Sequence, residues 1–155
     1  MSMDVHYSSG DNIGRYDWNT PKHIIDKLED EFGRFQLDPC ANSKSHHGEY
    51  WLTEEEDGLK YDWTAYSSVY MNPPYGKEIG KWVEKAMNTA KDSETKVVCL
   101  LPARTDTRWW HDFVTKAKEI RFLKGRVKFG GSKTGAPFPS AIVIFDGVGG
   151  GGTTD

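Results

Sequence analysis

The segment Asn72-Pro73-Pro74-Tyr75 carries the residues of this chain that are best suited to chemistry. The side-chain carbonyl of Asn72 and the backbone carbonyl of Pro73 can each accept a hydrogen bond from an amino group. Two such acceptors favour a more tetrahedral nitrogen with an available lone pair. The prolines stiffen the loop, and the Tyr75 ring offers a face for stacking on a flat base. The segment therefore suits a reaction at the amino group of an aromatic ring.

The position of this segment fits a ligand site. It directly follows the apolar run 68–71, which we expect to be a buried strand. Open α/β sheets bind ligands beyond the carboxyl ends of their strands. Asn and Pro are also common in ordinary turns, so the tetrapeptide alone leaves a purely structural interpretation open.

Around this segment, helical periods alternate with short apolar runs, and this pattern predicts an α/β fold with a mainly parallel sheet. We expect a helix from a Thr20 cap and Pro21 to a stop at Gly33, because Ile24, Ile25, Leu28 and Phe32 share a face. Further helices are predicted at 79–90 and 109–117. Strands are predicted at 35–40, 68–71, 96–102, 120–123, 126–129 and 141–145, and residues 42–57 are assigned to no element.

Length and composition limit the classes of protein that fit. The chain has 155 residues, of which 37% are hydrophobic, enough for one compact domain over 17–146 with loose segments at 1–16 and 147–155. The net charge of −3 gives no overall nucleic-acid signature, so any DNA contact must come from a local patch. The chain lacks an apolar run of about 18 residues and a signal peptide, so we expect a soluble protein of the cytoplasm, without a membrane partner.

The two cysteines and the histidines near one of them are candidates for special chemistry. Cys40 and Cys99 fall in apolar runs and fit buried reduced thiols better than a disulfide. Asp38, Cys40, His46 and His47 lie close in sequence, but their spacing fits no tetrahedral zinc pattern. We therefore expect no metal.

Several motifs, taken together and in order, resemble the phage-type DNA N-6-adenine methyltransferases, which are S-adenosylmethionine-dependent enzymes with an Asn-Pro-Pro-Tyr motif. The resemblance covers nearly all of 17–146. Its motifs are Trp18-Asn19-Thr20-Pro21, Leu37-Asp38-Pro39-Cys40-Ala41, Asp57-Gly58-Leu59, Asp62-Trp63, Asn72-Pro73-Pro74-Tyr75 and Ala136-Pro137-Phe138-Pro139-Ser140-Ala141.

The resemblance implies a reduced Rossmann-like methyltransferase fold with an antiparallel closing strand and helices on both faces. It implies transfer of a methyl group from S-adenosylmethionine to the N6 amino group of adenine in DNA, leaving S-adenosylhomocysteine. A phage enzyme of this kind would act in the host cytoplasm and protect phage DNA from restriction. The oligomeric state stays open, as a monomer or a weak dimer.

The same resemblance assigns roles to residues. Asn72, Pro73, Pro74 and Tyr75 are catalytic. Thr20 and Pro21 lie against the methionine part of the cofactor, Asp38 helps to hold its amine, Asp57 accepts from the ribose hydroxyls, and Asp62 with Trp63 contacts its adenine. The cofactor set is completed by Pro39, Cys40, Ala41 and Asn72. The Gly-x-Gly turn usual after the first strand of methyltransferases is absent, so the whole set of motifs carries this inference.

Candidate DNA contacts lie mainly in the C-terminal half. Basic residues that could contact phosphates are Arg104, Arg108, Lys124, Arg126, Lys128 and Lys133, and each would otherwise belong to a solvated mixed-charge surface. The loop 130–139 could enter DNA and help to hold an extruded base, on which Tyr75 and either Phe129 or Phe138 would stack. Either phenylalanine could equally belong to the core. Sequence specificity is low or is carried by loops such as 102–108 and 130–139.

Two other functions remain compatible with the sequence. The same fold could methylate the amino group of cytosine or a protein glutamine amide, because all of these are planar nitrogens. A nucleic-acid-binding module that has lost catalysis is the other alternative, and the intact tetrapeptide argues against it.

Overall fold

The sheet of this protein is mainly parallel. The computed structural model describes residues 19–147, so Trp18 and the predicted loose segments, apart from Gly147, lie outside the described residues. Within that range a six-stranded sheet has the order β2-β1-β3-β4-β6-β5. Its strands are β1 (Leu37–Asp38), β2 (Tyr50–Trp51), β3 (Ser68–Met71), β4 (Lys96–Pro102), β5 (Glu119–Phe122) and β6 (Ser140–Asp146).

Strand direction follows the predicted pattern. Strands β2, β1, β3 and β4 are joined by parallel pairings. Strand β6 is antiparallel to both β4 and β5, between which it lies. The predicted mainly parallel sheet with an antiparallel closing strand is therefore confirmed.

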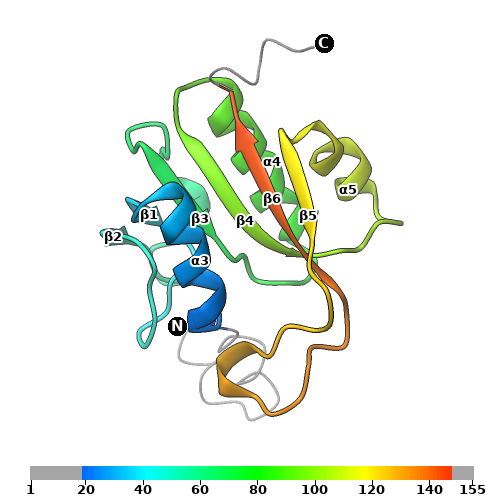
Figure 1. Ribbon diagram of the computed structural model, residues 1–155. Coiled ribbons are helices and arrows are strands. Elements are labelled where there is room, and N and C mark those ends of the chain that lie inside the picture. Colours follow the sequence, from blue (N-terminus) through cyan, green and yellow to red (C-terminus); the bar gives the residue numbers. More distant parts are fainter. Residues whose placement is uncertain (1–18, 148–155) are drawn as a thin grey trace.

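Helices cover both faces of the sheet, as expected (Figure 1). The helices are α3 (Lys22–Phe32), α4 (Ile79–Lys91) and α5 (Arg108–Asp112), with 3-10 turns η1 (Gly58–Lys60), η2 (Val114–Lys116) and η3 (Phe129–Gly131). Successive side chains of β4 point to opposite faces. Val98 and Leu100 pack in the cluster that includes α3, whereas Cys99 and Leu101 pack in the cluster that includes α4.

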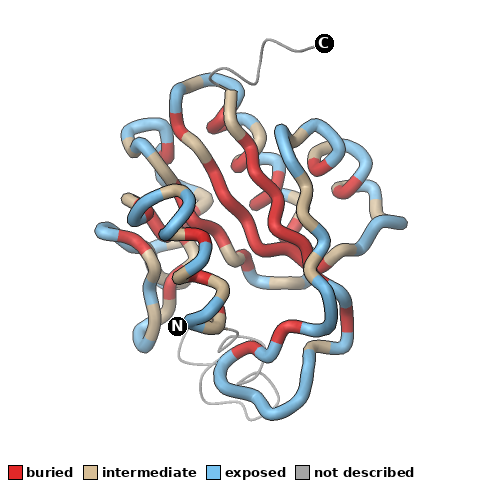
Figure 2. The backbone as a smooth tube through the Cα atoms, in the orientation of Figure 1, coloured by how far each residue is buried: buried red, intermediate tan, exposed pale blue. Residues whose placement is uncertain are grey.

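Burial explains why these segments form their elements. The predicted apolar stripe of α4 is largely buried, with Met87 only partly so. Strands β4 and β6 are buried along almost their entire length (Figure 2). This burial agrees with the near-continuous apolar run of β4, since a strand covered on both faces has no polar side.

Some predictions of local structure were wrong. Thr20 does not cap α3, because no side chain caps that helix and its flanking residue is Pro21. Residues 126–129 form no strand, because β5 pairs directly with β6 and this segment is instead anchored by the buried side chains of Val127 and Phe129. The first predicted strand shortens to β1, and the helix predicted at 109–117 divides into α5 and η2.

Candidate functional site

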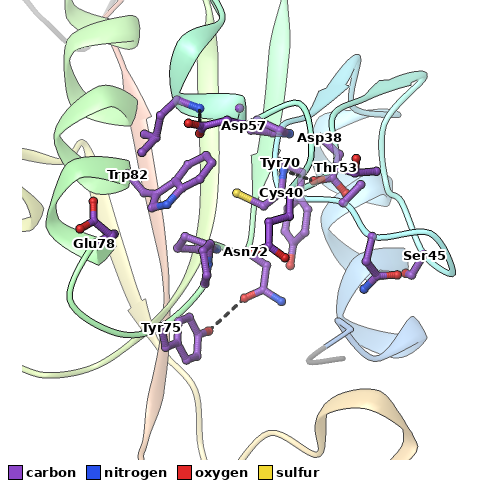
Figure 3. A pocket seen from close by; sticks show the side chains of 18 of the residues that line it. Asp38, Cys40, Ser45, Thr53, Asp57, Tyr70, Asn72, Tyr75, Glu78 and Trp82 are labelled. Carbon is purple, nitrogen blue, oxygen red and sulfur yellow. Dashed lines mark hydrogen bonds between the residues drawn. The ribbon is translucent and has the colours of Figure 1, made fainter. Parts of the chain in front are cut away.

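A cavity opens beyond the carboxyl ends of β1 and β3. It has a volume of about 610 Å³, within the usual range for sites that enclose a small molecule. Its walls come from the loop after β1, the turn before η1, the loop after β3 and the start of α4 (Figure 3). The predicted ligand-binding edge of the sheet is therefore the edge that carries the cavity.

Asn72 is held at both ends of its side-chain amide. Its Oδ1 accepts a hydrogen bond from the Tyr75 hydroxyl at 3.0 Å, drawn as a dashed line in Figure 3. Its Nδ2 donates to Thr20 Oγ1 at 3.4 Å. Asn72 follows β3 immediately, so the strand delivers this amide to the cavity.

Tyr75 is supported by an aromatic cluster that packs against the Asn72-Pro73-Pro74-Tyr75 segment. Its ring makes edge contacts with Phe138 at 5.3 Å and with Phe129 at 6.2 Å. Its hydroxyl also lies 3.3 Å from the carbonyl oxygen of Leu100. Burial raises the pKa of Tyr75 well above its ordinary value, so its phenol stays protonated and remains a donor.

Burial decides between the two alternatives expected for Phe129 and Phe138. Phe129 is 6% exposed and Phe138 is 5% exposed. Both belong to the apolar cluster on the α3 side of the sheet. Neither ring offers a face for a base in this arrangement, so the structure places both in the core, behind Tyr75.

Asp38 is a buried carboxylate at the end of β1. It is 3% exposed, and Oδ1 accepts from the Cys40 amide at 3.0 Å while Oδ2 accepts from the His47 amide at 2.9 Å. Burial raises the pKa of Asp38 to about 6, and the two backbone donors oppose that change. The Asp38 carboxylate thus stabilises the loop after β1 through these two hydrogen bonds, and it also lines the cavity.

The Asp57-Gly58 turn closes the cavity beside this loop. Asp57 has a left-handed backbone with φ of 61°, and its Oδ1 accepts from the Leu59 amide at 3.1 Å. A Cβ atom on Gly58 would overlap the carbonyl oxygen of Pro39. Glycine at this position therefore lets the turn press against the loop after β1, which places Asp57 at the cavity.

The structure gathers most of the predicted catalytic and cofactor-binding residues around the cavity. Those that line the cavity are Thr20, Asp38, Pro39, Cys40, Ala41, Asp57, Asn72, Pro73, Pro74 and Tyr75. Pro21, Asp62 and Trp63 do not line it. Asp62 is exposed and accepts from the amide and hydroxyl of Thr64 at 2.9 and 2.7 Å.

Trp63 is a core residue, and a different tryptophan reaches the cavity. Trp63 is fully buried, its Nε1 donates to Gly58 O at 3.0 Å, and its ring stacks on Trp82 with centroids 6.1 Å apart. Trp82 lines the cavity. Sequence reasoning assigned Trp82 only to the buried stripe of α4, although its position in the helix that follows Asn72-Pro73-Pro74-Tyr75 was a usable signal.

The predicted basic residues are exposed, and one lies close to the site. Arg104 lies over the ring of Phe138 at 5.5 Å, and that ring contacts Tyr75. Arg126 donates to the carbonyl oxygen of Ala136 at 3.2 Å and so braces the loop that contains η3. Arg108, Lys124, Lys128 and Lys133 are exposed.

Metal clusters and membrane-spanning helices are both absent from residues 19–147. In this range, no three His, Cys, Asp or Glu side chains converge as a metal-binding cluster would. The helices there are all too short or too polar to cross a bilayer.

The fold and the site define a Rossmann-like protein of the methyltransferase type, with a carboxylate after β1 and Asn-Pro-Pro-Tyr after β3. The sequence profile of the DNA N-6-adenine-methyltransferase (Dam) family matches residues 8–144. The chain belongs to this family. The resemblance noted from the motifs is thereby confirmed.

Two phage proteins illustrate the relationship. The DNA N-6-adenine-methyltransferase of Escherichia phage T1 is 30% identical over 107 residues, which cover 69% of this chain and 44% of that protein. The DNA N-6-adenine-methyltransferase of Haemophilus phage HP1 is 29% identical over 136 residues, which cover 83% of this chain and 78% of that protein. The chain thus spans less than half the length of the T1 relative and most of the HP1 relative.

Proposed function

We propose that this protein transfers a methyl group from S-adenosylmethionine to the N6 amino group of adenine in DNA. The observation that carries this proposal is the position of the Asn72 amide oxygen, held by Tyr75 in a cavity that Asp38 also lines. The family and the phage relatives support adenine as the acceptor of the methyl group, because their names specify adenine N6.

The cavity has the chemical groups that S-adenosylmethionine requires. The Asp38 carboxylate suits the ammonium of the methionine part, since an ionised acceptor strengthens a hydrogen bond. Asp57 offers acceptor atoms for ribose hydroxyls. Trp82 and Leu59 supply apolar surface for a flat base. When bound, the cofactor supplies an electrophilic methyl group.

In the reaction, Asn72 Oδ1 and the Pro73 carbonyl would accept the two hydrogens of the adenine amino group. These acceptors favour the geometry in which the nitrogen lone pair points at the methyl group. Pro73 is buried and follows Asn72 on a proline-stiffened loop, so both acceptors are positioned before the substrate arrives. Tyr75 would stack on the base.

DNA must present the target adenine outside the helix, because the amino group cannot reach an enclosed cavity while it is stacked. Arg104 is the best candidate for an adjacent phosphate contact, since it lies over Phe138, next to Tyr75. The exposed tip 130–135 extends from a segment anchored by Val127 and Phe129, and we assign it to contacts with the DNA groove.

Adenine is distinguished from other acceptors by product analysis. Purified protein is incubated with labelled S-adenosylmethionine and unmethylated double-stranded DNA, and the nucleosides are separated. We expect label in N6-methyladenine. Label in 4-methylcytosine would support the same mechanism of methyl transfer but would show that cytosine, not adenine, is the acceptor. Label only in a protein glutamine, or cofactor binding with no transfer at all, would overturn the proposal.

The relatives also suggest a biological setting. Both are phage proteins, and we infer a role in the cytoplasm of an infected host, where methylated phage DNA would resist restriction. Comparing the restriction of phage DNA made with and without the active protein tests this role.

A further inference from the structure

The orientation of the Asn72 amide decides what the cavity offers to a substrate. A side-chain amide has an acceptor end and a donor end, and rotation by half a turn exchanges them. An amine hydrogen needs the acceptor end. If Nδ2 occupied the place of Oδ1, two donors would face each other.

Thr20 holds the donor end of this amide from a distant part of the chain. Its Oγ1 accepts from Asn72 Nδ2 at 3.4 Å across a separation of 52 residues. Thr20 is 7% exposed, and its hydroxyl does not cap α3. The hydroxyl is therefore directed toward the catalytic segment and away from the helix that follows it.

Tyr70 fixes the Thr20 hydroxyl in turn. The two hydroxyl oxygens lie 2.5 Å apart. Tyr70 is in β3, is fully buried, and has its ring against Phe35 with centroids 5.5 Å apart. Burial raises the pKa of Tyr70 well above its ordinary value, so the phenol stays neutral. A rigid strand residue therefore sets the position of Thr20.

We propose that Thr20 and Tyr70 are positioning residues that keep the Asn72 amide oxygen directed at the substrate amine, through the contacts Tyr70–Thr20–Asn72. This inference rests on the proposed function. It gives Thr20 a role in turnover, whereas family resemblance places Thr20 against the cofactor. Tyr70 receives a role that none of the motifs assigns.

The two roles of Thr20 are separated by kinetics. Thr20→Val keeps the shape of the side chain but removes its hydroxyl, whereas Thr20→Ser keeps a hydroxyl at this position. We expect Thr20→Val to lower kcat by about twofold to tenfold, the effect of losing one net hydrogen bond. The Kd for S-adenosylmethionine, measured by calorimetry, should change by less than about twofold, and Thr20→Ser should recover most of the rate.

Tyr70→Phe provides a second variant that removes only the phenolic oxygen. The double variant Thr20→Val with Tyr70→Phe leaves neither hydroxyl facing a lost partner, so it guards against misfolding of Thr20→Val alone. Its kcat should match that of Thr20→Val, because both changes act through the same amide.

Asn72→Asp is the matched control for orientation. A carboxylate has an acceptor at both positions, so rotation no longer exchanges an acceptor for a donor. Thr20→Val should therefore reduce kcat much less in the Asn72→Asp background than in the wild type. If Thr20→Val instead caused a general loss of structure, it would reduce kcat by the same factor in the wild-type and Asn72→Asp backgrounds.

A measurement without cofactor or DNA completes the test. The two Asn72 amide protons are assigned in a ¹⁵N spectrum by their loss in Asn72→Ala. We expect their exchange with water to quicken in Thr20→Val and to return toward the wild-type rate in Thr20→Ser.

The outcomes separate the two proposals. Wild-type protein that transfers no label to adenine would overturn the proposed function, and this inference with it. Active wild type with an unchanged kcat in Thr20→Val, or with a weakened cofactor Kd as the only effect, would overturn this inference alone. Equal effects of Thr20→Val in the wild-type and Asn72→Asp backgrounds would also overturn it.

Discussion

The hydroxyl of Tyr75 donates to Asn72 Oδ1 at 3.0 Å, so two residues of one tetrapeptide hold each other in place. The same hydroxyl lies 3.3 Å from Leu100 O in β4. Because an amide oxygen has two lone pairs, a bond from Tyr75 is compatible with a bond from a substrate amine. The hydroxyl of Tyr75 thus bonds to Asn72, and under the proposed function its ring would stack on the target base.

We expect substitution of Asn72 to impair turnover far more than cofactor binding. Asn72→Ala should lower kcat by about 10²–10³-fold, the usual effect of removing one preorganised group that stabilises a transition state. Its Kd for S-adenosylmethionine should stay within about threefold of the wild-type value, because the lost bond acts mainly during turnover. Single-turnover labelling with calorimetry measures both. An unchanged rate would remove Asn72 from the mechanism.

The ring and the hydroxyl of Tyr75 can be separated. Tyr75→Phe keeps the ring and should lower kcat by about twofold to tenfold through the lost hydrogen bond. Tyr75→Ala removes the stacking face, worth about 1–3 kcal/mol per base, and should lower kcat/KM for DNA by about fivefold to 150-fold. Steady-state kinetics at saturating cofactor tests the difference. Equal losses in the two variants would show that the ring contributes nothing.

Asp38 should make stability and cofactor affinity depend on pH. Its pKa in the folded protein is raised to about 6 by burial, so the native state binds its proton more tightly than the unfolded state does. The resulting stabilisation is fully present below about pH 4 and is lost as pH rises through about 6, in total about 2–3 kcal/mol. Without cofactor, the free energy of unfolding should therefore fall across this window.

Binding of S-adenosylmethionine should follow the opposite trend. Its ammonium requires the ionised Asp38, so affinity should decrease as pH is lowered through about 6. Thermal unfolding and calorimetry between pH 4 and 8 measure both trends, with Asp38→Asn as the control that lacks the titrating group. Parallel pH profiles for the wild type and Asp38→Asn would contradict the assignment.

Substitution of Gly58 would test the close packing of the Asp57-Gly58 turn against the loop after β1. A Cβ atom there would overlap the Pro39 carbonyl oxygen, so Gly58→Ala should destabilise the fold by about 1–3 kcal/mol and weaken cofactor binding. Gly33→Ala is the control, because its φ of 82° adds strain at the end of α3 but no atom lies within 4 Å of the new Cβ. Chemical denaturation and calorimetry should find weakened binding only for Gly58→Ala.

Arg104 tests the proposed DNA contact. Arg104→Gln should weaken DNA binding at low salt and reduce the slope of log K against log salt by about 1, because one phosphate contact is lost. Lys118→Gln is the control. The Lys118 ammonium lies 3.6 Å from the carboxylate of Asp146, at the end of β6, so we do not expect it to contact a phosphate. Titrations at several salt concentrations measure the slope. Equal slopes for the wild type and Arg104→Gln would exclude this contact.

Local patterns in the sequence determined much of the fold and the centre of the candidate site. The stripe of α4 and the apolar run of β4 were predicted because their periodicity depends only on neighbouring residues. The end of β3 at Met71, directly before Asn72, was predicted for the same reason. The antiparallel closing strand and the helices on both faces required the family resemblance in addition. The order of the strands was not predicted.

Tertiary structure decided which side chains reach the cavity. Thr20 contacts Tyr70 across 50 residues and so does not cap its own helix. Phe129 and Phe138 pack behind Tyr75, and Trp82 lines the cavity while Trp63 is buried beneath it. These outcomes depend on contacts between segments far apart in the sequence. A local pattern can mark a residue as apolar or as a potential cap, but only the packing of distant segments determines which partner it meets.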